Sequence, residues 1–214
     1  MKSQVFKANT ELSKTRQLTI TAILGAMASG LMFAEISLPM FIPGFVKFDL
    51  SDLPALIAAF AVGPVSGVCV CLIKNLVNIA ITYSGGIGEL ANFLIGCGLV
   101  IPAGLIYKVK KTRGTAIAGA LTGSAVMALV SIPVNYFISY PFYTHFMEMD
   151  SIIKAYQALN PKVETLMDAL VWFNMPFTFV KGLCCTAVTV AVYKYLSPVL
   201  KHGSSRENRA AQGQ

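Results

Sequence analysis

The chain has 214 residues, of which 55% are hydrophobic and 13% are charged, about half the charged share of a soluble globular domain. Apolar runs of about 20 residues separate the charged clusters, which is the length that crosses a bilayer as a helix. The net charge of +7 comes from basic residues that flank these runs rather than from a basic patch interleaved with aromatics, which argues against nucleic acid as a partner. The composition predicts an all-α, polytopic membrane protein.

The first predicted span covers residues 18–38 and follows a polar, basic segment, residues 1–17. It carries two pairs of small residues one helical turn apart, Ala22 with Ala26 and Gly25 with Ser29. Small residues at this spacing open a smooth face against which another helix can pack closely. Because such pairs also arise by chance in apolar segments, the pattern alone leaves an intermolecular contact and a chance occurrence open.

A turn-rich stretch follows over residues 39–44, because the prolines within it cannot continue the helix. Residues 45–50 are predicted to be extended or to form a loop. Ser51 or Asp52 can cap a second helix, with Pro54 tolerated in its first turn, and this helix ends at the Gly-Pro pair of residues 63–64. The second helix is short for a straight span.

Four further spans follow along the chain. They are predicted at residues 65–83, 89–107, 115–137 and 168–195, with a basic loop at 108–113 and an outer loop with a short surface helix at 139–164. Residues 197–214 form a polar tail. The sequence thus predicts a six-transmembrane-helix bundle over residues 18–196.

Basic residues are distributed unevenly between the two sides of this bundle. Twelve of the 17 lysines and arginines fall on the side that holds both termini, three fall on the other side, and Lys74 and Lys181 lie within spans. Because basic loops stay in the cytoplasm, this asymmetry predicts that both termini are cytoplasmic.

Motifs for catalysis, nucleotide binding or metal binding are missing from the sequence. It contains no phosphate-binding loop of the G-x-x-x-x-G-K-S/T kind, and neither His145 nor His202 belongs to a metal-binding pattern. The five cysteines are an odd number within apolar runs, so they do not suggest a disulfide framework. We therefore expect no enzymatic activity, no bound metal and no cofactor.

The two lysines within spans are the most informative residues, because a lysine near the bilayer centre costs about 2.5–3.5 kcal/mol. For Lys74, a buried structural ion pair or a side chain that reaches the interface is the alternative to a ligand contact. Thr178 and Lys181 are three residues apart and share a helix face, so they can present a hydroxyl and an ammonium to one ligand. Asn135 lies at a similar depth, where a packing hydrogen bond is its alternative role.

Several segments, in this order, resemble the riboflavin-specific substrate-binding (S) component of energy-coupling factor (ECF) vitamin transporters. The resemblance extends over residues 18–195. The segments are FDLSDLPAL (48–56), GPVSG (63–67), LIKNL (72–76), GELANF (88–93), PAGLIY (102–107), Asn135-Tyr136 and PFTFVKG (176–182).

The resemblance implies a high-affinity riboflavin site that faces outward from a six-helix bundle in a bacterial cell membrane. It also implies a partner module of one transmembrane scaffold subunit and two ATPases, with Ala22 and Ala26 contacting the scaffold. Asn135 and Lys181 are the implied ring-binding residues. Thr178 stands where the family pattern has asparagine, and Asn174 lies one turn earlier.

The remaining residues of the shared segments complete the expected substrate-binding set, namely Lys74, Glu89 and Asn92. Residues 39–50 are expected to act as a lid over the site. The alternatives are an S component for a different vitamin and a stand-alone membrane facilitator or enzyme that needs no ATPase partner.

Overall fold

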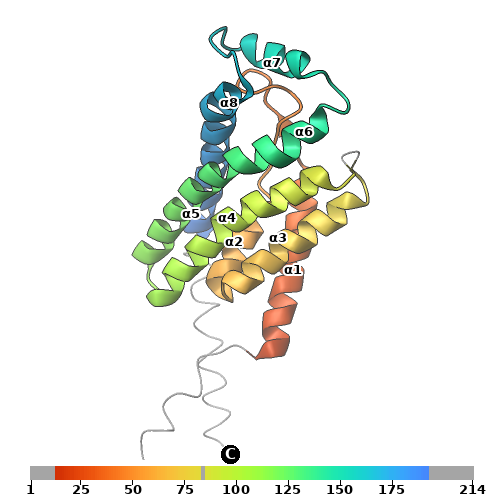
Figure 1. The fold of residues 1–214 in the computed structure, drawn as a ribbon. Coiled ribbons are helices and arrows are strands. Elements are labelled where there is room, and N and C mark those ends of the chain that lie inside the picture. Colours follow the sequence, from red (N-terminus) through yellow and green to blue (C-terminus); the bar gives the residue numbers. More distant parts are fainter. Residues whose placement is uncertain (1–12, 83–84, 193–214) are drawn as a thin grey trace, which may run out of the picture.

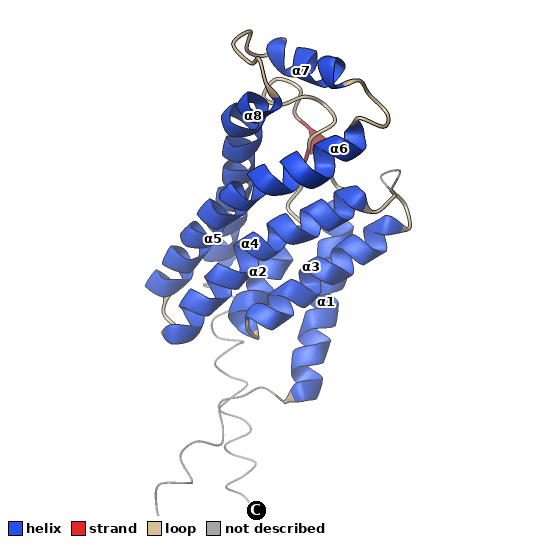
Figure 2. Cartoon of the chain, in the orientation of Figure 1, coloured by secondary structure: helices blue, strands red, loops and turns tan. Residues whose placement is uncertain are grey.

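The computed structural model describes residues 13–82 and 85–192. Within these ranges most of the chain is helical, with one small antiparallel strand pair (Figures 1 and 2). The helices are α1 (Lys14–Phe33), α2 (Asp52–Ala61), α3 (Pro64–Ile79), α4 (Ile87–Val109), α5 (Arg113–Val134), α6 (Tyr140–Tyr143), α7 (Met149–Gln157) and α8 (Leu166–Ala169). The strands are β1 (Ile36–Ser37) and β2 (Lys47–Phe48).

Two π-helical segments lengthen the later helices. One, Asn135–Ser139, joins α5 to α6, and the other, Leu170–Asn174, follows α8. The helical path is therefore continuous over Arg113–Tyr143 and over Leu166–Val192. The fifth predicted span thus extends beyond its expected end at residue 137. The expected end of the sixth, at residue 195, lies outside the described residues.

Three helices in the described part of the chain are long and apolar enough to cross a membrane, namely Ile87–Val109, Arg113–Tyr143 and Leu166–Val192. The helices α2 and α3 are apolar but have only 10 and 16 residues. These features support the predicted membrane protein of mainly helical structure, whereas the number of six spans stays a prediction. The strand pair, of two residues in each strand, is a local feature and leaves the mainly helical fold class as predicted.

The segment between α1 and α2 differs in part from the prediction. The first helix ends at Phe33 and not at residue 38, because Ile36 and Ser37 pair with Phe48 and Lys47 in antiparallel register. The predicted extended conformation of residues 45–50 is confirmed at β2. The second helix begins at Asp52, as predicted, but the Ser51 side chain does not cap it.

The helix α4 packs against both α3 and α5 in the middle of the bundle (Figure 1). Glycines allow the close approach of α4 and α5, since a Cβ atom on Gly119 would lie 2.8 Å from the carbonyl oxygen of Ala103. Leu56, Phe60, Leu99 and Met127 are buried together here in the core between α2, α4 and α5.

A separate apolar cluster forms a cap at one end of the molecule. The amphipathic α7, which confirms the predicted surface helix, contributes Ile152 and Tyr156, and the segment after β1 contributes Ile42. The remaining buried members are Tyr140, Val163, Ala169 and Leu170. This end lies opposite the connection between α4 and α5 (Figure 1).

Candidate functional site

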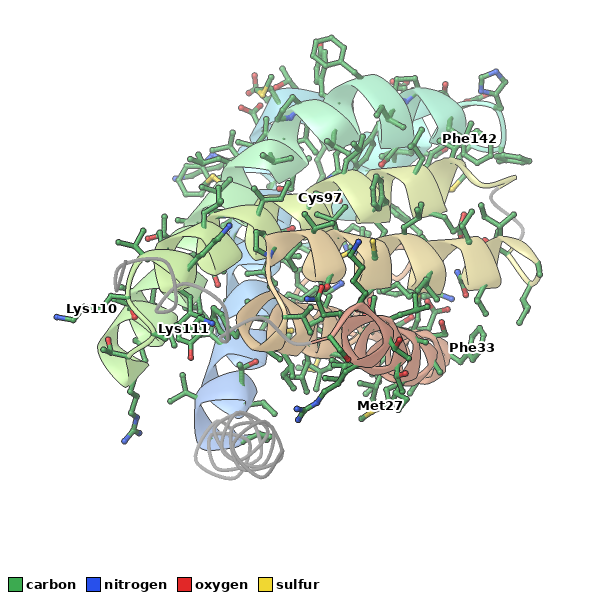
Figure 3. All side chains as sticks on the ribbon, turned by 90° about the horizontal axis from the view of Figure 1, so that it is seen from below. Met27, Phe33, Cys97, Lys110, Lys111 and Phe142 are labelled. Atoms are coloured by element: carbon green, nitrogen blue, oxygen red, sulfur yellow. The ribbon has the colours of Figure 1, made fainter. Side chains whose placement is uncertain are left out.

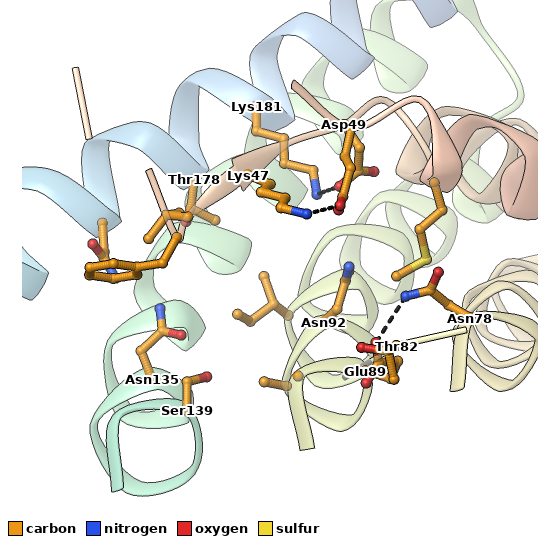
Figure 4. A pocket seen from close by; sticks show the side chains of 18 of the residues that line it. Lys47, Asp49, Asn78, Thr82, Glu89, Asn92, Asn135, Ser139, Thr178 and Lys181 are labelled. Carbon is orange, nitrogen blue, oxygen red and sulfur yellow. Dashed lines mark hydrogen bonds and ion pairs between the residues drawn. The ribbon is translucent and has the colours of Figure 1, made fainter. Parts of the chain in front are cut away.

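A cavity of about 760 Å³ lies between the helices and the segment that connects α1 to α2. Its volume falls within the range of about 300–1,000 Å³ that is typical of small-molecule sites. Apolar and aromatic side chains form much of the wall, including Met32, Phe45, Ile95, Tyr143 and Phe177. Polar side chains converge on the same space from several elements (Figure 4). They are Glu35, Lys47, Asp49, Asn78, Thr82, Glu89, Asn92, Asn135, Ser139, Asn174, Thr178 and Lys181.

Six of the seven side chains predicted to bind substrate line this cavity. They are Glu89, Asn92, Asn135, Asn174, Thr178 and Lys181. Although these residues are spread over almost 100 positions of the sequence, the structure brings them to one site. The seventh, Lys74, is not among the lining residues.

The two π-helical segments set the position of three polar residues in the wall. Asn135 and Ser139 lie at the two ends of the first segment, and Asn174 ends the second. In each segment a hydrogen bond spans five residues, from Tyr140 N–H to Asn135 C=O and from Met175 N–H to Leu170 C=O. Wider turns of this kind occur often at functional sites.

Both π-helical segments are followed by a proline, which is a signal for them in the sequence. Pro141 and Pro176 each follow a π-helical segment by two residues. Since proline has no N–H, the carbonyl four residues earlier loses its usual α-helical donor, and the helix can widen there.

Thr178 and Lys181 lie on the same face of the last helix and both line the cavity, as their spacing predicted. The ammonium of Lys181 donates a hydrogen bond of 2.9 Å to Asp49 Oδ2 and lies 3.2 Å from Asp52 Oδ2. Burial by itself raises the pKa of the Asp49 carboxyl, but the ammonium groups of Lys181 and Lys74 outweigh that effect and hold the pKa below its usual range. Asp49 is therefore ionised.

Lys74 lies behind the cavity wall and is fully buried. Its ammonium donates hydrogen bonds of 2.6 Å to both Asp52 Oδ1 and Ser51 Oγ, and it lies 3.5 Å from Asn92 Oδ1. In this structure Lys74 therefore forms a buried ion pair with Asp52, which was one of the alternatives to a ligand contact.

Asn174 joins the cavity wall to the cap. Its Oδ1 accepts a hydrogen bond of 2.7 Å from the Tyr156 hydroxyl, and its Nδ2 donates one of 3.0 Å to the Tyr140 hydroxyl. The two tyrosine hydroxyls also bond to each other. Both polar atoms of this amide are thus engaged with the protein.

On α4, the Glu89 carboxylate accepts a hydrogen bond of 2.9 Å from Asn78 Nδ2 on α3 (Figure 4). Glu89 is buried, and Asn92 lies one turn further along the same helix. Amide, carboxylate, hydroxyl and ammonium groups beside aromatic walls suit a flat organic ligand with polar edges.

Several residues of the candidate site were not expected from the sequence. Asp49 was not among the expected site residues and Asp52 was expected only as a helix cap, yet both contact Lys181. Their signal was available, because two lysines within spans require acidic partners and these two acids lie in the shared segment 48–56. The tyrosines that hold Asn174 had no comparable signal.

The two small-residue pairs of α1 lie on different faces of the helix. Gly25 and Ser29 are buried, and a Cβ atom on Gly25 would lie 3.0 Å from Ile73 of α3. Ala22 and Ala26 are exposed. The exposed Met27 and Phe33 also lie on the outer side of α1, seen along the helix in Figure 3. The Ala22–Ala26 face is therefore open to another helix.

Comparison with known proteins gives consistent results over nearly the whole chain. The family model described as "ECF transporter, substrate-specific component" matches residues 16–193. The chain is 33% identical to the riboflavin transporter RibU of Staphylococcus aureus, over 89% of this chain and 95% of that protein. It is 29% identical to the riboflavin transporter FmnP of Bacillus subtilis, over 90% and 97% of the two chains. A solved structure of the S component of a bacterial ECF transporter matches with a TM-score of 0.70 and 30% identity, covering 87% of this chain and 98% of that one.

Proposed function

This chain belongs to the substrate-specific components of ECF transporters, and we propose that it binds riboflavin with high affinity in the 760 Å³ cavity for uptake into a bacterial cell. The observation that carries the proposal is the convergence of the expected polar residues on one cavity of suitable size, in a chain similar to riboflavin transporters. No catalytic step and no cofactor are assigned to this chain, and riboflavin is its transported ligand.

The cavity offers complementary surfaces for the flat flavin ring. Aromatic and aliphatic side chains such as Phe45 and Phe177 cover its faces, while Asn135, Thr178 and Lys181 bind its polar edge. Thr178 has a shorter reach than the asparagine of the family pattern, so we propose that a water molecule mediates its contact.

Glu89 and Asn92 extend the polar lining on α4, at a separate part of the cavity (Figure 4). Asn174, whose amide is held by two tyrosines, borders the site from the cap. Lys74 supports the site from behind through Asp52 and Asn92.

Equilibrium titration of the purified protein with riboflavin, followed by quenching of flavin fluorescence, tests this function. Saturable binding of one riboflavin per chain supports it, and a yellow purified protein would already indicate a retained flavin. Preferential binding of another compound in a panel of vitamins, with no binding of riboflavin, would overturn the proposal in favour of an S component for that vitamin.

We propose that the bundle crosses the bacterial plasma membrane six times with both termini in the cytoplasm. The α4–α5 connection, which carries Lys110 and Lys111 (Figure 3), lies at the opposite end of the molecule from α7, and the excess of basic residues favours its cytoplasmic placement. Single cysteines introduced at Lys111 and at Lys154, in a background without the native cysteines, should be labelled from opposite sides in intact cells. Labelling of both by an impermeant reagent from outside would contradict this topology.

The transporter module is proposed to consist of one transmembrane scaffold subunit and two ATPases, with the exposed Ala22–Ala26 face of α1 as the contact with the scaffold. Replacing Ala26 with leucine should leave riboflavin binding unchanged but reduce uptake about tenfold, since overpacking a helix contact costs about 1–3 kcal/mol. Uptake of labelled riboflavin and co-purification with the ATPases are the measurements.

A matched control is Leu121→Trp, which adds bulk to an exposed position of α5 and should not affect uptake. If Ala26→Leu protein is inserted normally and transports as well as the wild type, the assigned interface is wrong. Riboflavin uptake by the chain in cells that lack the ATPases would instead favour a stand-alone facilitator.

A further inference from the structure

Four buried charges form one cluster beside the cavity: Asp49, Asp52, Lys74 and Lys181. All four residues are at most 8% exposed. Ion pairs of 2.6 Å (Lys74–Asp52), 2.9 Å (Lys181–Asp49) and 3.2 Å (Lys181–Asp52) connect them. Two cations balance two anions, so the cluster as a whole is neutral and no buried charge is left without compensation.

The half of the cluster that contains Lys74 is fixed in the core. The Lys74 ammonium has acceptors in Asp52, Ser51 and Asn92, which together can use its three protons. Asp52 is fully buried in the first turn of α2. This carboxylate is therefore a permanent part of the packed bundle.

The half that contains Lys181 is different. Lys181 donates one hydrogen bond, of 2.9 Å, to Asp49 Oδ2. Its ion pair with Asp52 Oδ2 is longer, at 3.2 Å, and Asp52 Oδ2 accepts no hydrogen bond from the described residues. Because an ammonium has three protons and Lys181 lines the cavity, donor capacity remains for a ligand.

The two carboxylates near Lys181 belong to different kinds of structure. Asp52 lies in a helix, whereas Asp49 lies in the connection between β2 and α2. The connecting segment between α1 and α2 also supplies Phe45, Val46 and Lys47 to the cavity wall. The hydrogen bond between Asp49 and Lys181 thus ties this wall segment to the last helix, 132 residues away in the sequence.

We propose that Asp49 is a positioning residue for Lys181, and that it couples the conformation of the α1–α2 segment to the strength of ligand binding. With Asp49 in place, its hydrogen bond holds the ammonium at the cavity. Without Asp49, the ammonium moves closer to Asp52 Oδ2, the other carboxylate oxygen with which it forms an ion pair, and away from the ligand. Because coupling is reciprocal, a ligand that engages Lys181 also stabilises the segment that carries Asp49.

The first test measures riboflavin binding in detergent, so it rests on the proposed function. It compares Asp49→Asn, Asp49→Glu, Lys181→Ala, the double variant Asp49→Asn, Lys181→Ala, and the control Glu164→Gln. Asp49→Asn should weaken binding about tenfold or more, mainly through faster dissociation, because the acceptor of the Lys181 hydrogen bond loses its negative charge and holds the ammonium less strongly. Asp49→Glu keeps the charge and should recover much of the affinity. The control Glu164→Gln removes a carboxylate from an exposed position between α7 and α8, and this variant should bind riboflavin like the wild type.

The decisive comparison is the double variant Asp49→Asn, Lys181→Ala. If Asp49 acts through Lys181, the double variant should bind no more weakly than Lys181→Ala alone. Additive losses, or an Asp49→Asn variant that binds like the Glu164→Gln control, would overturn the proposal.

A second test uses the protein without ligand and so does not depend on which vitamin binds. Hydrogen exchange of the amides of residues 45–50 should be faster in Asp49→Asn and in Lys181→Ala than in the wild type. In the double variant it should be no faster than in either single variant. Equal exchange in all of these proteins would contradict the link even where riboflavin binds. Faster exchange in a protein that binds no riboflavin would uphold the link and reject the proposed ligand.

Discussion

Replacing Lys74 with methionine should destabilise the folded protein by about 3–5 kcal/mol, because the change leaves a buried carboxylate without its closest partner. Lys74 and Asp52 are both fully buried and their ion pair measures 2.6 Å, so solvent does not screen the loss. Ser51 Oγ also loses its contact with the ammonium. Reversible unfolding in mixed detergent micelles measures the change in the free energy of unfolding.

Two further variants separate the ion pair from other effects. The double variant Lys74→Met, Asp52→Leu keeps the cluster neutral through Lys181 and Asp49, so it should regain much of the lost stability. Lys154→Met removes a lysine from the exposed face of α7 and should alter stability little. A stability of Lys74→Met equal to that of Lys154→Met would show that the buried pair does not stabilise the fold.

The ends of helices could be predicted where the chain contains helix-breaking glycine and proline residues. Gly63 and Pro64 mark the boundary between α2 and α3, and Gly85 and Gly86 directly precede the start of α4 at Ile87. The end of α1 could not be predicted in this way, because the apolar run continues through residue 38. Strand pairing between Ile36 and Phe48 ends the helix there, and that contact is long-range.

Part of the cavity could also be predicted from the residues themselves, because polar groups within apolar helices are costly and therefore informative. Glu89 and Asn92 were expected only from the family resemblance. Helical periodicity placed Thr178 and Lys181 on one face, and the structure places both in the cavity wall. Periodicity cannot show which acid meets which lysine. The partners of Lys74 and Lys181 lie 22 and 132 residues away along the chain, and only the packing of α2 and α3 and the path of the connecting segment bring them together.

Because local spacing does not show long-range partners, the expected and the observed contacts of Asn174 differ. From the sequence, Asn174 is a polar residue one turn before Thr178 and is available to a ligand. In the structure both of its polar atoms bond to tyrosines of the cap. A contact with ligand would therefore require either a shared hydrogen bond or a rearrangement of Tyr140 and Tyr156, neither of which is encoded in local spacing.

Removing the charge at Lys181 should cause the largest loss of ligand binding. Lys181→Ala should weaken riboflavin binding by about 1–3 kcal/mol, because a ligand acceptor would be buried without its donor. Lys181 is 8% exposed and lines the cavity, so water can replace the ammonium only poorly. Fluorescence titration gives the affinity, and a monodisperse elution profile with an intact helical spectrum establishes that the variant is folded. Unchanged affinity in folded protein would assign Lys181 to a structural role within the charge cluster.

Thr178→Asn is the companion variant, since it restores the residue of the family pattern on the same helix face. Asparagine reaches further into the cavity and offers both a donor and an acceptor, so riboflavin binding should be preserved or become tighter. Thr178 is partly buried and lines the cavity, which leaves room for the larger side chain on that side. Titration of this variant with the vitamin panel distinguishes the two ligand hypotheses. Tighter binding of riboflavin supports direct contact with position 178, whereas a gain for another vitamin without one for riboflavin would favour an S component for that vitamin.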